Sequence, residues 1–264
     1  MHLEVVTHEP KTNARSTPLL FVHGAWHGAW CWTEFFLPYF AEHGFRSHAI
    51  DLRGHGKSEG SNRLRWAGIT HYISDVGQVV EQLEEPPVLI GHSMGGLVVQ
   101  KYLESDAKIP AAVLLAAVPP AGAMRTTLNI AMRHPAAFLK ANATLKLYPI
   151  VGTPELTREA FFSADMHEEK VRTYYQRIQN ESYRAFLDMM LLNLPRPSRV
   201  KTPMLVLGAA NDAIFSPKEI KASAQAYRTQ AEIFDGMAHD MMLEAGWQSV
   251  ADRILSWLEE RGMG

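Results

Sequence analysis

The stretch that decides the fold is PPVLIGHSMGGLVVQKYL, residues 86–103. A run of apolar β-forming residues ends at Ile90, the segment GHSMGG (91–96) follows, and a helical pattern begins at once. This order predicts a buried strand, a sharp turn and a helix, with Ser93 raised at the carboxyl end of the strand. Such a turn strains the serine backbone and leaves no space for Cβ atoms at the flanking positions, which explains the glycines.

Short apolar runs alternate with helical patterns on both sides of this stretch. Buried strands are expected at 19–24, 87–93, 111–120, 203–212 and 231–236, with a further strand that runs into a glycine-rich loop at 46–56. Helices are expected at 30–44, 73–85, 94–105, 217–227 and 247–261. Strands that alternate with helices indicate βαβ units. The expected fold class is therefore α/β, with a mostly parallel central sheet flanked by helices.

The pattern changes between residues 121 and 197, where no convincing buried strand is found. This stretch is rich in Met, Leu, Ala, Tyr and Arg and is punctuated by prolines. Its apolar content is too high for a solvated tether, so we expect an inserted unit of short helices. The predicted organisation is a core of residues 1–120 and 198–264 with a helical cap of residues 121–197 inserted in it.

The composition excludes several classes of protein. The chain has 264 residues, 47% of them hydrophobic and 20% charged, and a formal net charge of -2, so no basic footprint for nucleic acid is present. The single cysteine, Cys31, cannot form an internal disulfide and is expected to be a small core residue. No signal-peptide pattern and no apolar run of roughly 18 to 20 residues occurs, so a soluble cytoplasmic protein without a membrane partner is expected.

The position of Ser93 suggests a nucleophile, but a serine hydroxyl needs a base, and the base needs an orienting acid. The expected order along the chain is serine, acid, histidine. Asp212 and His239 each follow a predicted strand, and the loops at the carboxyl ends of strands meet at one edge of a parallel sheet. We therefore predict Ser93, His239 and Asp212 as nucleophile, base and acid, with Asp235 and Asp240 as alternative acids.

The anion formed by attack on a carbonyl needs hydrogen-bond donors, each worth about 3 kcal/mol in the transition state. The Met94 N–H at the start of a helix is one expected donor, and the Ala25 N–H after Gly24 is the other. His23 is expected to support this loop structurally. His23 and His27 have no clustered carboxylate or cysteine in the sequence, so neither a metal nor a cofactor is expected.

These segments together resemble the α/β-hydrolase superfamily, and the resemblance covers essentially the whole chain. VHGAWHGAWCW (22–32), GHSMGG (91–96), the aspartate after LVLGAAN (205–211) and AHDMMLE (238–244) follow that family's order and spacing. The first is especially similar to the oxyanion-hole loop of the plant methylesterase and hydroxynitrile lyase group, and DLRGHGKS (51–58) is similar to a loop of bacterial esterases. The resemblance implies an α/β-hydrolase fold whose helical cap covers the substrate pocket.

Two departures narrow the chemistry that the resemblance implies. The nucleophile position holds serine rather than aspartate, which argues against haloalkane dehalogenase and epoxide hydrolase chemistry. The similar hydroxynitrile lyases carry lysine directly after the catalytic histidine and threonine in the oxyanion loop, where this chain has Asp240 and Gly24. A proton-shuttling lyase is therefore not expected.

The residues predict a serine hydrolase that cleaves carboxylic esters of small to medium hydrophobic substrates through an acyl-enzyme. A lactonase acting on N-acyl homoserine lactones or similar cyclic esters stays open, because ring opening needs the same three residues. C–C bond hydrolysis, with Arg125, Arg177 or Arg184 binding a substrate carboxylate, and a ligand receptor are further alternatives. Candidate pocket residues are Trp26, Met124, Leu145, Phe186 and Met190, and Glu244 is interpreted as an ordinary charge at a helix start rather than a catalytic group. The oligomeric state is not indicated.

Overall fold

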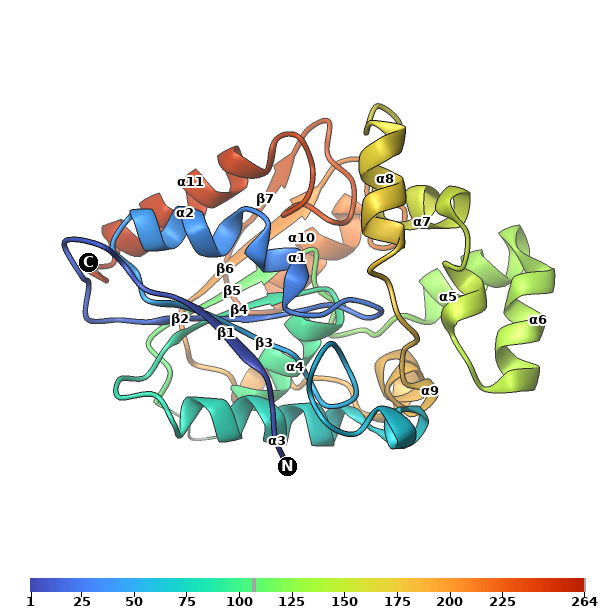
Figure 1. Cartoon of the computed structure of the whole chain (residues 1–264), viewed down its shortest axis with the longest axis horizontal. Helices are drawn as coiled ribbons and strands as arrows, with labels where there is room; N and C mark the ends of the chain where they lie inside the picture. The colour runs from blue at the N-terminus through green and yellow to red at the C-terminus, as the bar shows by residue number, and fades with distance from the viewer. Residues whose placement is uncertain (106–107, 264) are drawn as a thin grey trace.

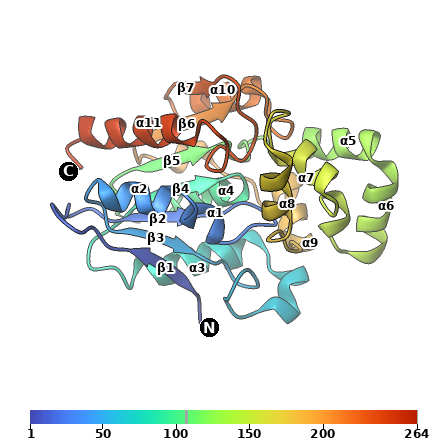
Figure 2. The same ribbon diagram turned by 45° about the horizontal axis from the view of Figure 1, so that its top comes forward.

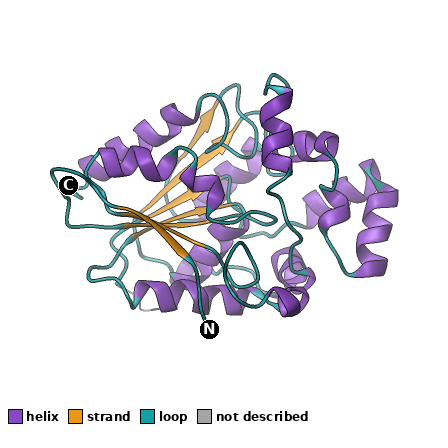
Figure 3. Ribbon diagram, viewed as in Figure 1, coloured by secondary structure: helices purple, strands orange, loops and turns teal. Residues whose placement is uncertain are grey.

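The computed structural model describes residues 1–105 and 108–263, which contain a seven-stranded sheet flanked by helices (Figures 1 and 3). The strands lie in the order β1-β3-β2-β4-β5-β6-β7. All neighbouring pairs are parallel except β1 and β3. The strands are β1 (Val5–His8), β2 (Leu19–Val22), β3 (Ser47–Ile50), β4 (Val88–His92), β5 (Ala112–Leu115), β6 (Met204–Ala209) and β7 (Ala231–Phe234). The predicted α/β class with a mostly parallel sheet is confirmed.

Helices cover both faces of the sheet. One face packs against α1 (Trp30–Thr33), α2 (Phe36–Glu42) and α11 (Trp247–Glu260). The other packs against α3 (Ile69–Val80), α4 (Met94–Tyr102) and α10 (Pro217–Ala226). Side chains of successive strand residues point to opposite faces of the sheet: Phe21 packs in the first helical layer, whereas Leu20 and Val22 pack in the second. This burial on both faces explains why the strands are continuous apolar runs.

Three details differ from the expectations. The strand β1 was not predicted, because it is an antiparallel edge strand whose residues are only half-buried and carry no long apolar run. The helix expected at 30–44 is divided into α1 and α2, with Phe35 in a non-helical conformation between them. The helix expected at 73–85 begins earlier, at Ile69, and ends at Val80.

Residues 121–197, called here the helical segment, lie between β5 and β6 and project from one end of the sheet (Figure 2). They contain no strand among the described residues. The helices are α5 (Met124–Arg133), α6 (Pro135–Thr144), α7 (Pro154–Phe161), α8 (Glu168–Tyr175) and α9 (Tyr183–Leu187), which continues into a π-helical turn at Asp188–Leu192. The division into core and cap stays a prediction, and its ranges include residues 106–107 and 264, which lie outside the described part of the chain.

The helical segment is tied to the sheet by buried polar contacts. The Glu244 carboxylate accepts hydrogen bonds from the Ser163 amide at 2.6 Å and from the Ser163 hydroxyl at 2.7 Å. Glu244, interpreted from the sequence as an ordinary charge at a helix start, has its side chain buried against this loop. Within residues 1–105 and 108–263, the structure has no helix long and apolar enough to cross a membrane.

Candidate active site

Ser93 lies at the junction of β4 and α4 with φ 50° and ψ -116°, a region that residues with a side chain rarely occupy. Its amide donates to the Leu115 carbonyl at 3.1 Å, so the neighbouring strand holds the turn. A Cβ on Gly95 would collide with the carbonyl of Val22. Strand, strained serine and close-packed glycine are thus arranged as the sequence predicts.

His239 and Asp212 come together at the same edge of the sheet. His239 Nδ1 donates to Asp212 Oδ2 at 2.8 Å. The other carboxylate oxygen of Asp212 accepts the amides of Ile214 and Phe215, at 2.7 and 3.0 Å, which fixes the side chain in its loop. His239 Nε2 is buried and has no hydrogen-bond partner among the described residues. The imidazole is therefore oriented on one side and available on the other.

The two alternative acids do not contact this imidazole through hydrogen bonds. Asp235 is exposed. Asp240 is fully buried, but its Oδ2 is 2.9 Å from His27 Nε2 and its Oδ1 has no hydrogen-bond partner in the described part of the chain. The geometry selects Asp212 as the partner of His239.

His92 links the loop of Ser93 to the loop of His239. Its Nε2 donates to the His239 carbonyl at 3.0 Å, and the two rings lie 4.8 Å apart. Burial, together with the neighbouring His239, lowers the pKa of His92 to about 3, so this ring is neutral at ordinary pH. Residue 92 directly precedes Ser93, so this contact places His239 beside the nucleophile turn.

The loop after β2 also closes on this turn. A Cβ on Gly24 would lie 2.8 Å from His92 Nδ1 and 3.0 Å from Ser93 Cβ, so only glycine fits without displacement. Within the described residues, the amides of Ala25 and Met94 donate to no protein acceptor. Both predicted oxyanion donors thus have an unused N–H.

His23 supports this loop, as expected. Its Nδ1 donates to the Gly24 carbonyl at 2.8 Å, and its Nε2 accepts the Leu52 amide at 3.1 Å. Burial and the neighbouring His55 lower the pKa of His23 to about 3. A neutral ring with both nitrogens occupied has no acid–base capacity left for a substrate.

A partly open groove lies beside the site. Its lining includes Trp26 of the β2 loop and Ile214, two residues after Asp212. The helical segment supplies most of the other apolar walls, formed by Ile130, Ile150, Val151, Leu156 and Ala160. It also supplies polar groups from Arg133, His134 and Glu159. Of the predicted pocket residues, Trp26 lines the groove, whereas Met124, Leu145, Phe186 and Met190 do not and stay predictions.

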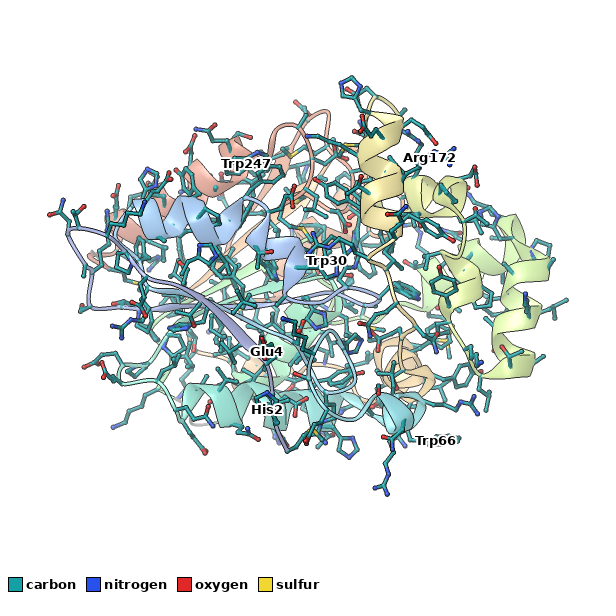
Figure 4. All side chains as sticks on the ribbon, viewed as in Figure 1. His2, Glu4, Trp30, Trp66, Arg172 and Trp247 are labelled. Carbon is teal, nitrogen blue, oxygen red and sulfur yellow. The ribbon has the colours of Figure 1, made fainter. Side chains whose placement is uncertain are left out.

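Aromatic side chains fill the space between the site and the helical segment. Phe161 of α7 lies 6.2 Å from the His239 ring and 5.9 Å from Trp26, measured between ring centroids. On the other side lies Trp30 of α1, which is labelled in Figure 4. Its ring stacks on Tyr174 of α8 with 6.1 Å between ring centroids, and the Arg177 guanidinium lies over its face. The rings of Phe161 and Phe215 thus lie against the imidazole, together with the neutral His92.

The sequence analysis missed a buried glutamate that joins the helical segment to the sheet. Glu181 accepts from His55 Nε2 at 3.0 Å, from the Tyr72 hydroxyl at 2.9 Å and from the Trp26 amide at 3.3 Å. Burial favours neutral Glu181, but the nearby His55 and these hydrogen bonds bring its pKa below the ordinary value. No pattern in the sequence marks Glu181, because these three partners are 109 or more positions away and its remaining partner is the amide of the adjacent Ser182.

One cluster could be taken for a metal centre. His92, His239 and Asp240 offer ligand atoms within 4.8 Å of one another. Hydrogen bonds already explain the arrangement, since His92 Nε2 bonds the His239 carbonyl, His239 Nδ1 bonds Asp212, and Asp240 bonds His27. That the protein needs no metal stays a prediction.

Comparisons with known proteins agree with this geometry. Residues 19–253 match the model of the alpha/beta hydrolase family. The methylesterase MES16 of Arabidopsis thaliana, which acts on pFDCC, is 29% identical over 74% of this chain and 77% of its own length. The bifunctional esterase/perhydrolase DCH of Acinetobacter calcoaceticus is 38% identical over 40% of this chain and 39% of its own.

The matches at higher identity are partial, and the chain spans less than half the length of those curated relatives. Among solved structures, an esterase from Exiguobacterium antarcticum superposes with a TM-score of 0.78 at 19% identity, covering 97% of this chain and 95% of that one. A likeness at this identity supports the fold. With the family model spanning most of the sequence, the chain belongs to the alpha/beta hydrolase family.

Proposed function

We propose that the protein is a serine hydrolase that cleaves carboxylic esters. The observation that carries the proposal is the oriented imidazole: Asp212 holds His239 Nδ1 at 2.8 Å, while Nε2 is unpartnered within the described residues. The His239 carbonyl accepts a hydrogen bond from His92, the residue before Ser93. A base held in one tautomer beside a strained serine is the arrangement that acyl transfer requires.

The mechanism follows from these positions. Ser93 Oγ attacks the ester carbonyl while His239 Nε2 takes its proton, and Asp212 stabilises the imidazolium that forms. The amides of Ala25 and Met94 stabilise the oxyanion of the tetrahedral intermediate. His239 then gives the proton to the leaving alkoxide, which departs as the alcohol. Water, activated by the same imidazole, hydrolyses the acyl-enzyme and releases the acid.

The groove supports an ester with a small to medium hydrophobic part. Its walls are mainly aliphatic, and its lining includes Trp26 of the predicted oxyanion loop and Ile214 of the Asp212 loop. Relatives named as a methylesterase and as an esterase/perhydrolase agree with a small-molecule ester substrate. A cyclic ester, such as an N-acyl homoserine lactone, is the second candidate, because the same groove could receive its acyl chain.

The arginines weigh against C–C bond hydrolysis, because each already has a partner. Arg125 pairs with Glu219 at 2.7 Å and Arg184 with Asp188 at 3.0 Å. Arg177 lies over the Trp30 ring at 4.6 Å. A ligand receptor would not require an oriented base or unused amides at the nucleophile, so the geometry favours turnover.

Acid release measured by pH-stat tests the proposal, with a series of linear p-nitrophenyl esters and a series of acylated lactones as substrates. Ser93→Ala should fold normally but lower kcat by about 10³-fold or more, because the nucleophile is absent. Ser256→Ala, an exposed serine, is the matched control and should keep wild-type activity. Retained turnover in Ser93→Ala would exclude the proposed mechanism, and a preference for lactones would replace the linear ester as substrate.

A further inference from the structure

His27 and Asp240 form a buried ion pair between the oxyanion loop and the loop of His239. His27 Nε2 is 2.9 Å from Asp240 Oδ2, and the two side chains are 1% and 0% exposed. The other ring nitrogen, His27 Nδ1, lies 2.7 Å from the carbonyl oxygen of Ala25. Both ring nitrogens therefore face acceptors, a carbonyl and a carboxylate. When the Asp240 carboxylate is ionised, only the doubly protonated, charged imidazole of His27 can donate to both acceptors.

We propose that the His27–Asp240 pair positions the oxyanion loop: the charged imidazole holds the Ala25 carbonyl and so aims the Ala25 amide at the reacting carbonyl. The inference rests on the proposed esterase mechanism. His27 and Asp240 are positioning residues, since they act through Ala25 and His239 and are not proposed to contact substrate. Ala25 is flanked by Gly24, which permits the close approach to Ser93 but does not itself restrict the loop conformation.

The pair also joins the loops that carry the predicted chemistry. Asp240 follows His239 directly, and its amide donates to the Phe161 carbonyl of α7 at 3.0 Å. Asp240 Oδ1 lies 3.7 Å from His92 Nε2, on the residue before Ser93. A shift of His27 would therefore displace the oxyanion loop, the His239 loop and the nucleophile turn. A misplacement of about 1 Å at such a site costs roughly 100-fold in rate.

The charges of the pair matter as much as its geometry. Burial alone would lower the pKa of His27 and raise that of Asp240, but each stabilises the charged form of the other, so the pKa of His27 is raised and that of Asp240 lowered. An unpaired carboxylate charge near the developing oxyanion would destabilise the transition state, and the positive charge of His27 neutralises that of Asp240. The groups facing His27 are Asp240, His92 and Glu181, and those facing Asp240 are His27, His92, His239, Cys31, Tyr174 and Glu244.

Kinetics of p-nitrophenyl butyrate hydrolysis provide the test, with Asp240→Asn, His27→Gln and the double variant. Each single change should lower kcat by about 10- to 100-fold with KM within about threefold, because oxyanion stabilisation is realised in the transition state. The double variant should be no slower than the slower single variant, since the residues act as one unit. Effects that multiply in the double variant, or a change confined to KM, would overturn the proposal.

Asp75→Asn is the matched control for loss of a buried carboxylate. Asp75 is 1% exposed and pairs with Arg53 at 2.6 Å, outside the site. It should lower the melting temperature without changing kcat. The ratio of wild-type kcat to that of Asp240→Asn should shrink only as pH rises through the pKa of His27, which is raised above the ordinary value of 6.5, because His27 in the wild type then loses the same charge. A pH-independent ratio would indicate a purely structural role.

A spectroscopic measurement separates this inference from the proposed function. In the Ser93→Ala protein, ¹⁵N chemical shifts of labelled histidine, assigned by comparison with His27→Gln, should show both His27 nitrogens protonated at neutral pH. In Ser93→Ala/Asp240→Asn, one nitrogen should be deprotonated. A neutral His27 in Ser93→Ala would overturn the proposal whatever the enzyme hydrolyses, whereas an active Ser93→Ala enzyme would overturn the esterase mechanism and leave the protonation result unaffected.

Discussion

The sheet and the helical segment differ in how their apolar side chains are placed. Strand residues such as Phe21 and Leu20 are fully buried between two helical layers. The helical segment leaves large apolar side chains between 38% and 72% exposed: Met124, Leu128, Met132, Leu139, Leu191 and Leu192. The difference teaches that the sheet holds its side chains between two packed layers, whereas the helical segment has only one packed side and turns part of its apolar surface to solvent.

The largest effect on kcat is expected when the acid at the edge of the sheet, Asp212, is replaced. Asp212→Asn preserves the shape of the side chain but favours the wrong tautomer of His239, so kcat should fall by about 10⁴-fold. The fall should be the same for short and long esters, because the base acts on all of them. A fall that depends on chain length would mean that Asp212 shapes the pocket instead.

The next prediction compares the free energy of unfolding lost by truncating a side chain in the core around the sheet with that lost in the helical segment. Phe40→Ala removes a fully buried ring that packs against Phe21, Phe36 and Phe45, and should cost about 3 to 5 kcal/mol of unfolding free energy. Leu139→Ala, on a side chain that is 68% exposed, should change it by no more than about 0.5 kcal/mol. Urea denaturation of both variants measures this, and similar costs would contradict the contrast between the regions.

The smallest expected effect concerns the preference of the enzyme for esters of different acyl-chain length, which the groove should determine. Leu156→Trp narrows the groove, so kcat/KM for hexanoate esters should fall by roughly tenfold while acetate esters are unaffected. Leu192→Trp, an exposed position of the helical segment outside the groove lining, serves as the control and should leave both substrates unchanged. Equal losses on acetate and hexanoate would show that the groove does not hold the acyl chain.

The same contrast explains what the sequence could predict. The strands around Ser93, Asp212 and His239 are continuous apolar runs, and the turns that follow them are marked by glycines and polar residues, so local pattern was sufficient to place these three side chains at one edge. Their order along the chain added the assignment of the base and acid. Strand β1 was missed because an edge strand with half-buried residues has no such pattern.

In the helical segment, composition does not reveal which face of each helix is turned inward. Met124 and Leu145 were expected in the pocket, yet neither lines the groove, whereas Ile150 and Leu156 do. The buried pairs His27–Asp240 and His55–Glu181 were likewise beyond prediction, since each joins residues more than 100 positions apart. Such contacts are fixed by tertiary packing, which a single sequence does not display.

Cys31 illustrates a consequence of the packing around α1. The side chain is fully buried, and burial, with Asp240 and Asp51 nearby, raises the pKa of its thiol well above the ordinary value. The reactive thiolate is therefore scarce, and alkylating or oxidising reagents have no path to the sulfur while α1 stays docked. Resistance of the native protein to oxidation at its single cysteine is thus set by the same packing that holds the β2 loop in place.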